Sequence, residues 1–193
     1  MKKIIIIITS FLLLCNFVSC GNVAPMEPEI DQIKSICEMA VMECHLHNVV
    51  KYHVDDATKF LFWTRDKDLW MEYDATVKLG IDMSLVDMEV KRSKVTITLP
   101  DAVIQSYTVE QDSMNFYTAK KSAKITADDT LIALSDAKED LYNEVSNNKD
   151  LLKSAQDRAK NILEDYINNI GNLIGKQYTI QWKYCDANGN IIQ

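Results

Sequence analysis

The residues of this chain best suited to chemistry are Glu43, His45 and His47. Their i, i+2 spacing places the three side chains on the same face of an extended strand. Imidazole and carboxylate groups are common ligands of transition metals, so one hypothesis is a metal-dependent enzyme or a metal-binding protein. The same spacing is typical of the solvated face of a half-buried strand. The sequence alone cannot show a further ligand close in space. We therefore favour the interpretation that these residues lie on a solvated strand face, and we expect no metal and no cofactor.

The cysteines indicate no second site. Three of them follow residue 20, namely Cys37, Cys44 and Cys185, and an odd number leaves at least one unpaired. No Cys-x-x-Cys pair is present, so neither a redox centre nor a zinc knuckle is indicated, and we expect small buried hydrophobic side chains. The chain also lacks the Gly-x-Ser-x-Gly, His-Glu-x-x-His and phosphate-loop motifs. An enzyme is therefore not indicated, although the metal alternative stays open.

The elements that position these residues centre on a strand at Leu69–Asp82. Apolar and polar residues alternate throughout it, and a period of two predicts a strand with one buried face and one wet face. Asp82–Leu85 breaks the run. Two more alternating runs, at Val86–Val90 and Val95–Leu99, then predict that all three segments form one antiparallel meander.

Neighbouring segments extend this sheet. Ile30–Met39 has apolar residues three or four apart and predicts a short helix, and the period of two from Ala40 to Tyr52 predicts the strand that carries Glu43. We expect a charged turn at Thr64–Asp68 and a further strand at Ala102–Val109.

A long helical pattern follows in the last third of the chain. Thr126, followed by acidic residues in the first turn at Asp128 and Asp129, predicts a helix start. The apolar stripe is interrupted at Asn148, which fits either one long helix with a kink or two helices at about 127–147 and 150–170. We favour a break at 146–150, where the second helix folds back. A final strand at 177–184 should return to the sheet. The predicted class is α+β, a mostly antiparallel sheet of about five or six strands packed against long C-terminal helices.

The first residues carry the signals of export. Residues 1–19 combine two lysines with an apolar stretch too short to span a membrane, which is typical of a signal peptide. Phe17-Val18-Ser19-Cys20 resembles a bacterial lipobox, so we expect cleavage before Cys20 and lipid, such as palmitate, on the new terminus. Cys15 is a poorer candidate, because the leucine before it is too large for the cleavage site. The prediction is a lipidated tether at 20–29 and a single domain at 30–193.

The charge argues against nucleic acid as a partner. The chain has 21 basic and 28 acidic residues, a formal net charge of −7. Removal of residues 1–19 takes away two lysines and makes the charge more negative. Affinity for nucleic acid rests on clustered lysine and arginine residues that neutralise phosphates, so we expect no nucleic-acid partner.

Several short segments together resemble a known family. They are Val-Lys-Leu-Gly-Ile-Asp-Met-Ser at 77–84, Val-Thr-Ile-Thr-Leu-Pro at 95–100, Ala-Gln-Asp-Arg-Ala-Lys at 155–160 and Tyr-Thr-Ile-Gln-Trp at 178–182. The sequence resembles the bacterial domain-of-unknown-function 4230 family over roughly residues 30–185. The resemblance implies an exported or membrane-anchored bacterial protein, and it supplies no activity and no catalytic residues.

Three hypotheses follow for function. The first is a lipid-anchored, non-enzymatic module of the bacterial cell envelope that binds another protein or assembles with itself. The second is a metal-dependent enzyme or metal-binding protein that uses Glu43, His45 and His47. The third is a membrane-associated scaffold similar to the band-7 proteins, and it rests on architecture alone.

Overall fold

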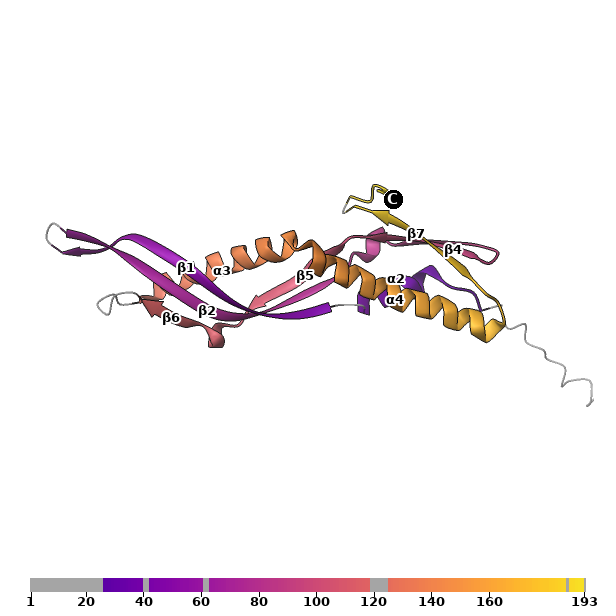
Figure 1. Cartoon of the computed structure of the whole chain (residues 1–193), viewed down its shortest axis with the longest axis horizontal. Coiled ribbons are helices and arrows are strands. Elements are labelled where there is room, and N and C mark those ends of the chain that lie inside the picture. The colour runs from indigo at the N-terminus through magenta and orange to yellow at the C-terminus, as the bar shows by residue number, and fades with distance from the viewer. Residues whose placement is uncertain (1–25, 40–41, 61–62, 119–124, 187, 193) are drawn as a thin grey trace, which may run out of the picture.

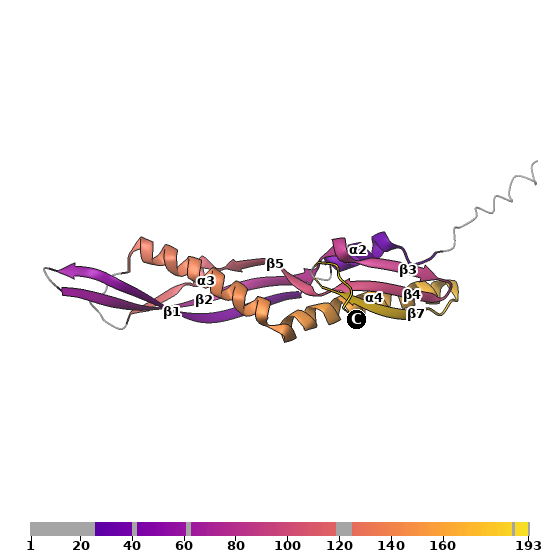
Figure 2. The same ribbon diagram turned by 90° about the horizontal axis from the view of Figure 1, so that it is seen from above.

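The computed structural model describes residues 26–39, 42–60, 63–118, 125–186 and 188–192. The molecule is elongated, and long helices run beside its strands (Figure 1, Figure 2). The class is α+β with mainly antiparallel pairing, which confirms the prediction. Its elements, in chain order, are α2 (Ile30–Met39), β1 (Met42–Phe60), β2 (Trp63–Ile81), the 3₁₀ turn η2 (Met83–Leu85), β3 (Asp87–Lys91), β4 (Lys94–Pro100), β5 (Ala102–Val109), the 3₁₀ turn η3 (Gln111–Ser113), β6 (Asn115–Thr118), α3 (Ala127–Asn147), α4 (Lys149–Ile174) and β7 (Thr179–Cys185).

The first sheet is built around β2, which pairs with β1 on one side and with β5 and β6 on the other, always antiparallel. Alternate residues of β2 are at most 1% exposed, so the strand predicted from its period of two is confirmed. These buried residues are Leu69, Met71, Tyr73, Ala75, Val77, Leu79 and Ile81. The opposite face of β2 is therefore free to present its polar side chains together with those of β1.

The hairpin between β1 and β2 is longer than predicted. Cross-strand pairing continues to Phe60 opposite Trp63, interrupted by an irregularity between Val54 and Thr58. The charged turn expected at Thr64–Asp68 is therefore wrong, because these residues lie within β2. A ladder of backbone hydrogen bonds can continue through polar residues that give no alternating pattern.

The prediction that the three alternating segments form a single meander is also wrong, because the chain changes sheets after β2. Asp82 caps the turn η2, accepting hydrogen bonds from the Ser84 backbone N at 2.9 Å and from its Oγ at 2.7 Å. The next two strands form a second sheet in the order β3-β4-β7. The final strand β7 lies beside β4 in parallel, with Lys94 opposite Thr179.

The two helices meet at Asn148, as predicted. Thr126 and Asp129 form a reciprocal capping box at the start of α3. The side chain of Asn148 accepts a hydrogen bond from the Leu151 backbone N at 3.1 Å and so begins α4. Figure 1 shows that α4 continues along the long axis of the molecule after a bend, so the break is confirmed but the predicted fold-back is wrong.

Small residues bring these helices close to the strands. Ala133, Ala137, Ala155 and Ala159 are all fully buried in the stripe that faces the core. An alanine adds little bulk between a helix and a sheet, so the backbones can approach closely. The hydroxyl of buried Tyr73 donates to the Ala137 carbonyl at 3.3 Å, which ties β2 directly to α3. The helices and the core thus occupy one side of β2, and the candidate residues lie on the other.

Candidate functional site

Glu43, His45 and His47 lie on the exposed face of β1. Their side chains are 46%, 74% and 59% exposed, respectively. The register of the hairpin sets them opposite Lys78, Thr76 and Asp74 of β2. We call this surface the histidine face and define it as Glu43, His45, His47, Lys51 and His53 of β1 with Asp68, Trp70, Glu72, Asp74, Thr76 and Lys78 of β2.

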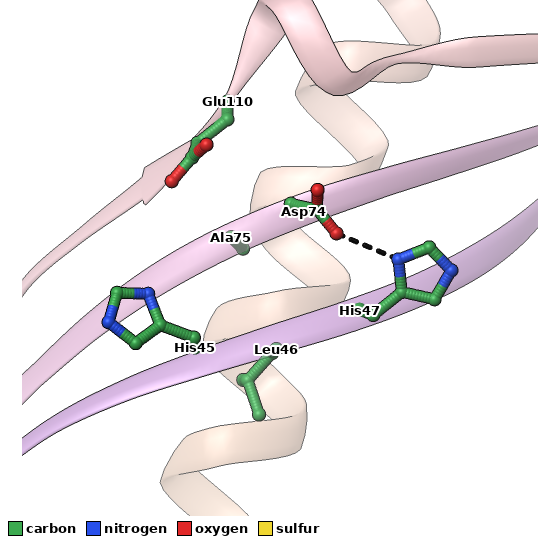
Figure 3. A pocket seen from close by; sticks show the side chains of 6 residues that line it. All are labelled: His45, Leu46, His47, Asp74, Ala75 and Glu110. Carbon is green, nitrogen blue, oxygen red and sulfur yellow. Dashed lines mark hydrogen bonds and ion pairs between the residues drawn. The ribbon is translucent and has the colours of Figure 1, made fainter.

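His47 is held between two carboxylates of the neighbouring strand. Its Nδ1 lies 2.7 Å from Asp74 Oδ1, and its Nε2 lies 2.9 Å from Glu72 Oε1 (Figure 3 draws the first contact). The hydrogen bonds to Asp74 and then to Glu72 raise the pKa of His47 above its ordinary value of 6.5. As an imidazolium the ring donates from both nitrogens. It then has no lone pair for a metal, so it acts as a tie between β1 and β2.

The partners of His47 are themselves held by other elements. The Tyr117 hydroxyl of β6 donates to Glu72 Oε2 at 2.9 Å, and the Asp74 backbone N donates to Ser113 Oγ at 2.7 Å. Three strands and the turn η3 therefore fix the geometry around this imidazole.

His45 belongs to a separate chain of hydrogen bonds. Thr76 Oγ1 donates to Glu110 Oε1 at 3.2 Å and lies 3.2 Å from His45 Nδ1. Because the hydroxyl has only one proton, it accepts from Nδ1 when it donates to Glu110. A hollow of about 250 Å³ is lined by His45, Leu46, His47, Asp74, Ala75 and Glu110 (Figure 3).

Beyond His47 along β1, a third group of side chains lies near the long hairpin. His53 Nδ1 is 2.8 Å from Asp68 Oδ1, and Lys51 Nζ is 3.4 Å from the same oxygen. The hydrogen bond from His53, followed by that from Lys51, lowers the pKa of Asp68. Lys51 also lies 5.6 Å from the centre of the Trp70 ring, within the range of a cation–π contact.

The structure does not bring the three predicted residues together as a metal site. His47 turns to Glu72 and Asp74, whereas His45 turns to Thr76, with Nε2 3.4 Å from Glu43 Oε1. Within the described ranges no three histidine, cysteine, aspartate or glutamate side chains are grouped so as to hold a metal ion. The contacts of His47 with Glu72 and Asp74, and of Thr76 with Glu110, could not be predicted from the sequence, because only the strand register brings these residues together.

A change of pH tests the tie at His47. Because the pKa of His47 is raised in the folded state, its protonation stabilises the fold, and this contribution is fully present below pH 6.5. The contribution is lost as the pH rises through the pKa of His47 in the folded state. We therefore expect part of the pH dependence of the thermal unfolding midpoint near neutral pH to disappear in His47→Gln. The neighbouring variant Val49→Ala, at a side chain 62% exposed, should keep the wild-type profile. Parallel profiles for His47→Gln and the wild type would contradict the tie.

The cysteines behave as expected where they are described. Cys37 and Cys185 are buried, Cys44 is half-buried, and none of the three forms a disulfide. Burial raises the pKa of the Cys37 thiol to about 11, so it stays protonated and unreactive at neutral pH. Cys20, the predicted lipidation site, lies outside the described residues.

Among the described residues no helix is both long and apolar enough to cross a membrane. The family model described as "Protein of unknown function (DUF4230)" matches residues 31–175. No curated protein and no solved structure matches the chain.

Proposed function

The chain belongs to the DUF4230 family of proteins of unknown function, and we propose that it is a lipid-anchored, non-enzymatic binding or assembly module of the bacterial cell envelope. The signal-like residues 1–19 and the lipobox-like residues that end in Cys20 support export and lipidation. Each buried CH₂ of a lipid chain contributes about 0.8 kcal/mol to membrane binding, so several chains on Cys20 would hold the protein firmly.

The shape of the molecule is the observation that carries the proposal. The first described residues lie at one end of the elongated body, where Glu27 contacts Lys176 at 3.2 Å (Figure 1). The long hairpin of β1 and β2 reaches toward the opposite end. A protein tethered by residues just before Met26 would thus project its hairpin and its histidine face away from the anchor.

The pairing of polar groups supports a binding role over a catalytic one. Both ring nitrogens of His47 contact carboxylates, and Thr76 links His45 to Glu110. A general acid or base needs a proton-transfer atom directed at a substrate. On the histidine face these atoms are directed at one another, which suits a firm surface for contact with another protein.

Replacement of Cys20 tests the anchor. We expect the full-length chain, produced with a C-terminal tag in a bacterial host and fed labelled palmitate, to incorporate the label and to fractionate with membranes. Cys20→Ser should lose the label completely, because the thiol that carries the lipid is absent. Light scattering on the detergent-solubilised wild type then distinguishes self-assembly from a module that binds a different protein.

Cys15→Ser is the matched control, because it removes the other cysteine of the same segment. It should label as the wild type does. Label that persists in Cys20→Ser, or that is lost only in Cys15→Ser, would refute anchoring at Cys20.

A further inference from the structure

A cationic turn lies in this otherwise acidic protein between β3 and β4. The four residues Lys91-Arg92-Ser93-Lys94 contain three positive charges and no negative one, in a chain of net charge −7. All four residues are exposed. Lys91 pairs with Glu89 at 2.6 Å, but in the described part of the chain neither Arg92 nor Lys94 forms an ion pair.

The backbone of this turn is strained at Arg92. Lys91 and Lys94 are cross-strand partners, so Arg92 and Ser93 form a two-residue hairpin loop. Arg92 has φ of 57°, and no other non-glycine residue in the described ranges has a positive φ. Glycine or asparagine is the usual choice at such a position, because a larger side chain crowds its own backbone there. Arginine at a backbone position that favours glycine indicates that the arginine side chain has a function.

A hydrogen bond and an ion pair place the turn at the end of the molecule where the first described residues lie. The Ser93 carbonyl accepts a hydrogen bond from the Thr179 backbone N at 2.7 Å. Three residues earlier, Lys176 Nζ lies 3.2 Å from Glu27 Oε1. Both views show the β3–β4 turn, the end of α4 and the first described residues at the same end of the body (Figure 1, Figure 2).

We propose that Lys91, Arg92 and Lys94 dock this end of the protein on the anionic phosphate headgroups of the membrane that holds it. The inference rests on the proposed lipid anchor at Cys20. The six residues from 20 to 25 can span at most about 20 Å, so the anchored end stays near the bilayer. A basic residue near an anionic surface contributes about 1 kcal/mol, which is about fivefold in the ratio of docked to undocked protein per cation. Docking would hold the elongated body upright, with the hairpin of β1 and β2 directed away from the lipid.

Hydrogen exchange on the anchored protein tests the docking. The mature lipidated chain is reconstituted into vesicles of phosphatidylcholine alone and of phosphatidylcholine with phosphatidylglycerol, and exchange is followed by mass spectrometry. We expect slower exchange of residues 89–96 in the anionic vesicles only, with the difference removed by high salt. Residues 111–118, in η3 and β6, serve as the internal control and should exchange equally in both.

Charge-removing variants identify the residues. Arg92→Asn with Lys94→Gln removes two cations while keeping a residue that tolerates positive φ, and it should lower the ratio of docked to undocked protein by about 25-fold. The single variant Arg92→Asn should also raise the thermal unfolding midpoint because it relieves strain, so weaker docking cannot be ascribed to unfolding. The distant variant Lys78→Gln, on the histidine face, should leave docking unchanged.

Several results would overturn the proposal. Equal exchange in the two kinds of vesicle, or equal protection in the charge-removing variant and the wild type, excludes docking by this turn. Protection that appears in intact envelopes but in neither vesicle would assign the turn to an acidic protein in place of lipid. The intact mass of the mature chain separates the two proposals: absence of lipid refutes the anchor, whereas a lipidated chain with an unprotected turn refutes only the docking.

Discussion

Leu141→Ala is expected to lower the free energy of unfolding by about 3 kcal/mol, in the range of buried leucine truncations. Leu141 is fully buried in the α3 stripe that covers the first sheet, together with Ala137 and Val145. Its small neighbours leave little bulk that could move into the vacated space, so much of the cavity should remain. The measurement is the midpoint and slope of denaturant unfolding.

The same helix offers a matched control. Leu131 also lies in α3, but its side chain is 65% exposed. Leu131→Ala makes the same chemical change without a cavity and should alter the free energy of unfolding by less than about 0.5 kcal/mol. Equal effects at the two positions would show that α3 does not pack on the sheet through the stripe described.

Gly171→Ala is expected to destabilise the protein by about 2–3 kcal/mol, as overpacking in a tight site does. In an ordinary helix interior the same change stabilises by about 1 kcal/mol, so the expected sign is reversed. A Cβ at Gly171 would overlap the carbonyl oxygen of Lys176 and lie 3.2 Å from the Tyr178 ring. The Lys176 backbone N donates to the Gly171 carbonyl at 2.8 Å, so the helix end cannot easily move away.

The control for this change is the next residue, Asn172, which is exposed in the same turn of α4. Asn172→Ala should be neutral or slightly stabilising, because alanine has the higher helix propensity. Thermal and denaturant unfolding of the two variants would decide the matter. A Gly171→Ala variant at least as stable as the wild type would mean that the helix end is looser than the structure shows.

Local patterns in the sequence predicted the single elements well. The alternation at Leu69–Ile81 gave the central strand because one face is buried and the other is wet. Thr126 marked the start of α3 and Asn148 marked the break before α4, and each side chain satisfies a backbone donor in the helix that follows it. Each of these signals depends on residues close together in the chain, and such signals can be read without the fold.

Relations between distant segments could not be predicted in the same way. The two carboxylates that hold His47 follow from the register of β1 on β2, and that register depends on where a long polar hairpin turns. Neither the change of sheet after Asp82 nor the parallel pairing of β4 with β7 has a local signal in the sequence. The family match supports the resemblance that the short segments gave, and it adds no site residues.

The pairing of β4 with β7 also bears on how the protein folds. The two strands are separated along the chain by β5, β6 and both long helices. Closing so large a loop is costly and makes formation of the second sheet slow compared with that of the local β3–β4 hairpin. During synthesis this sheet therefore stays incomplete until β7 has emerged from the ribosome.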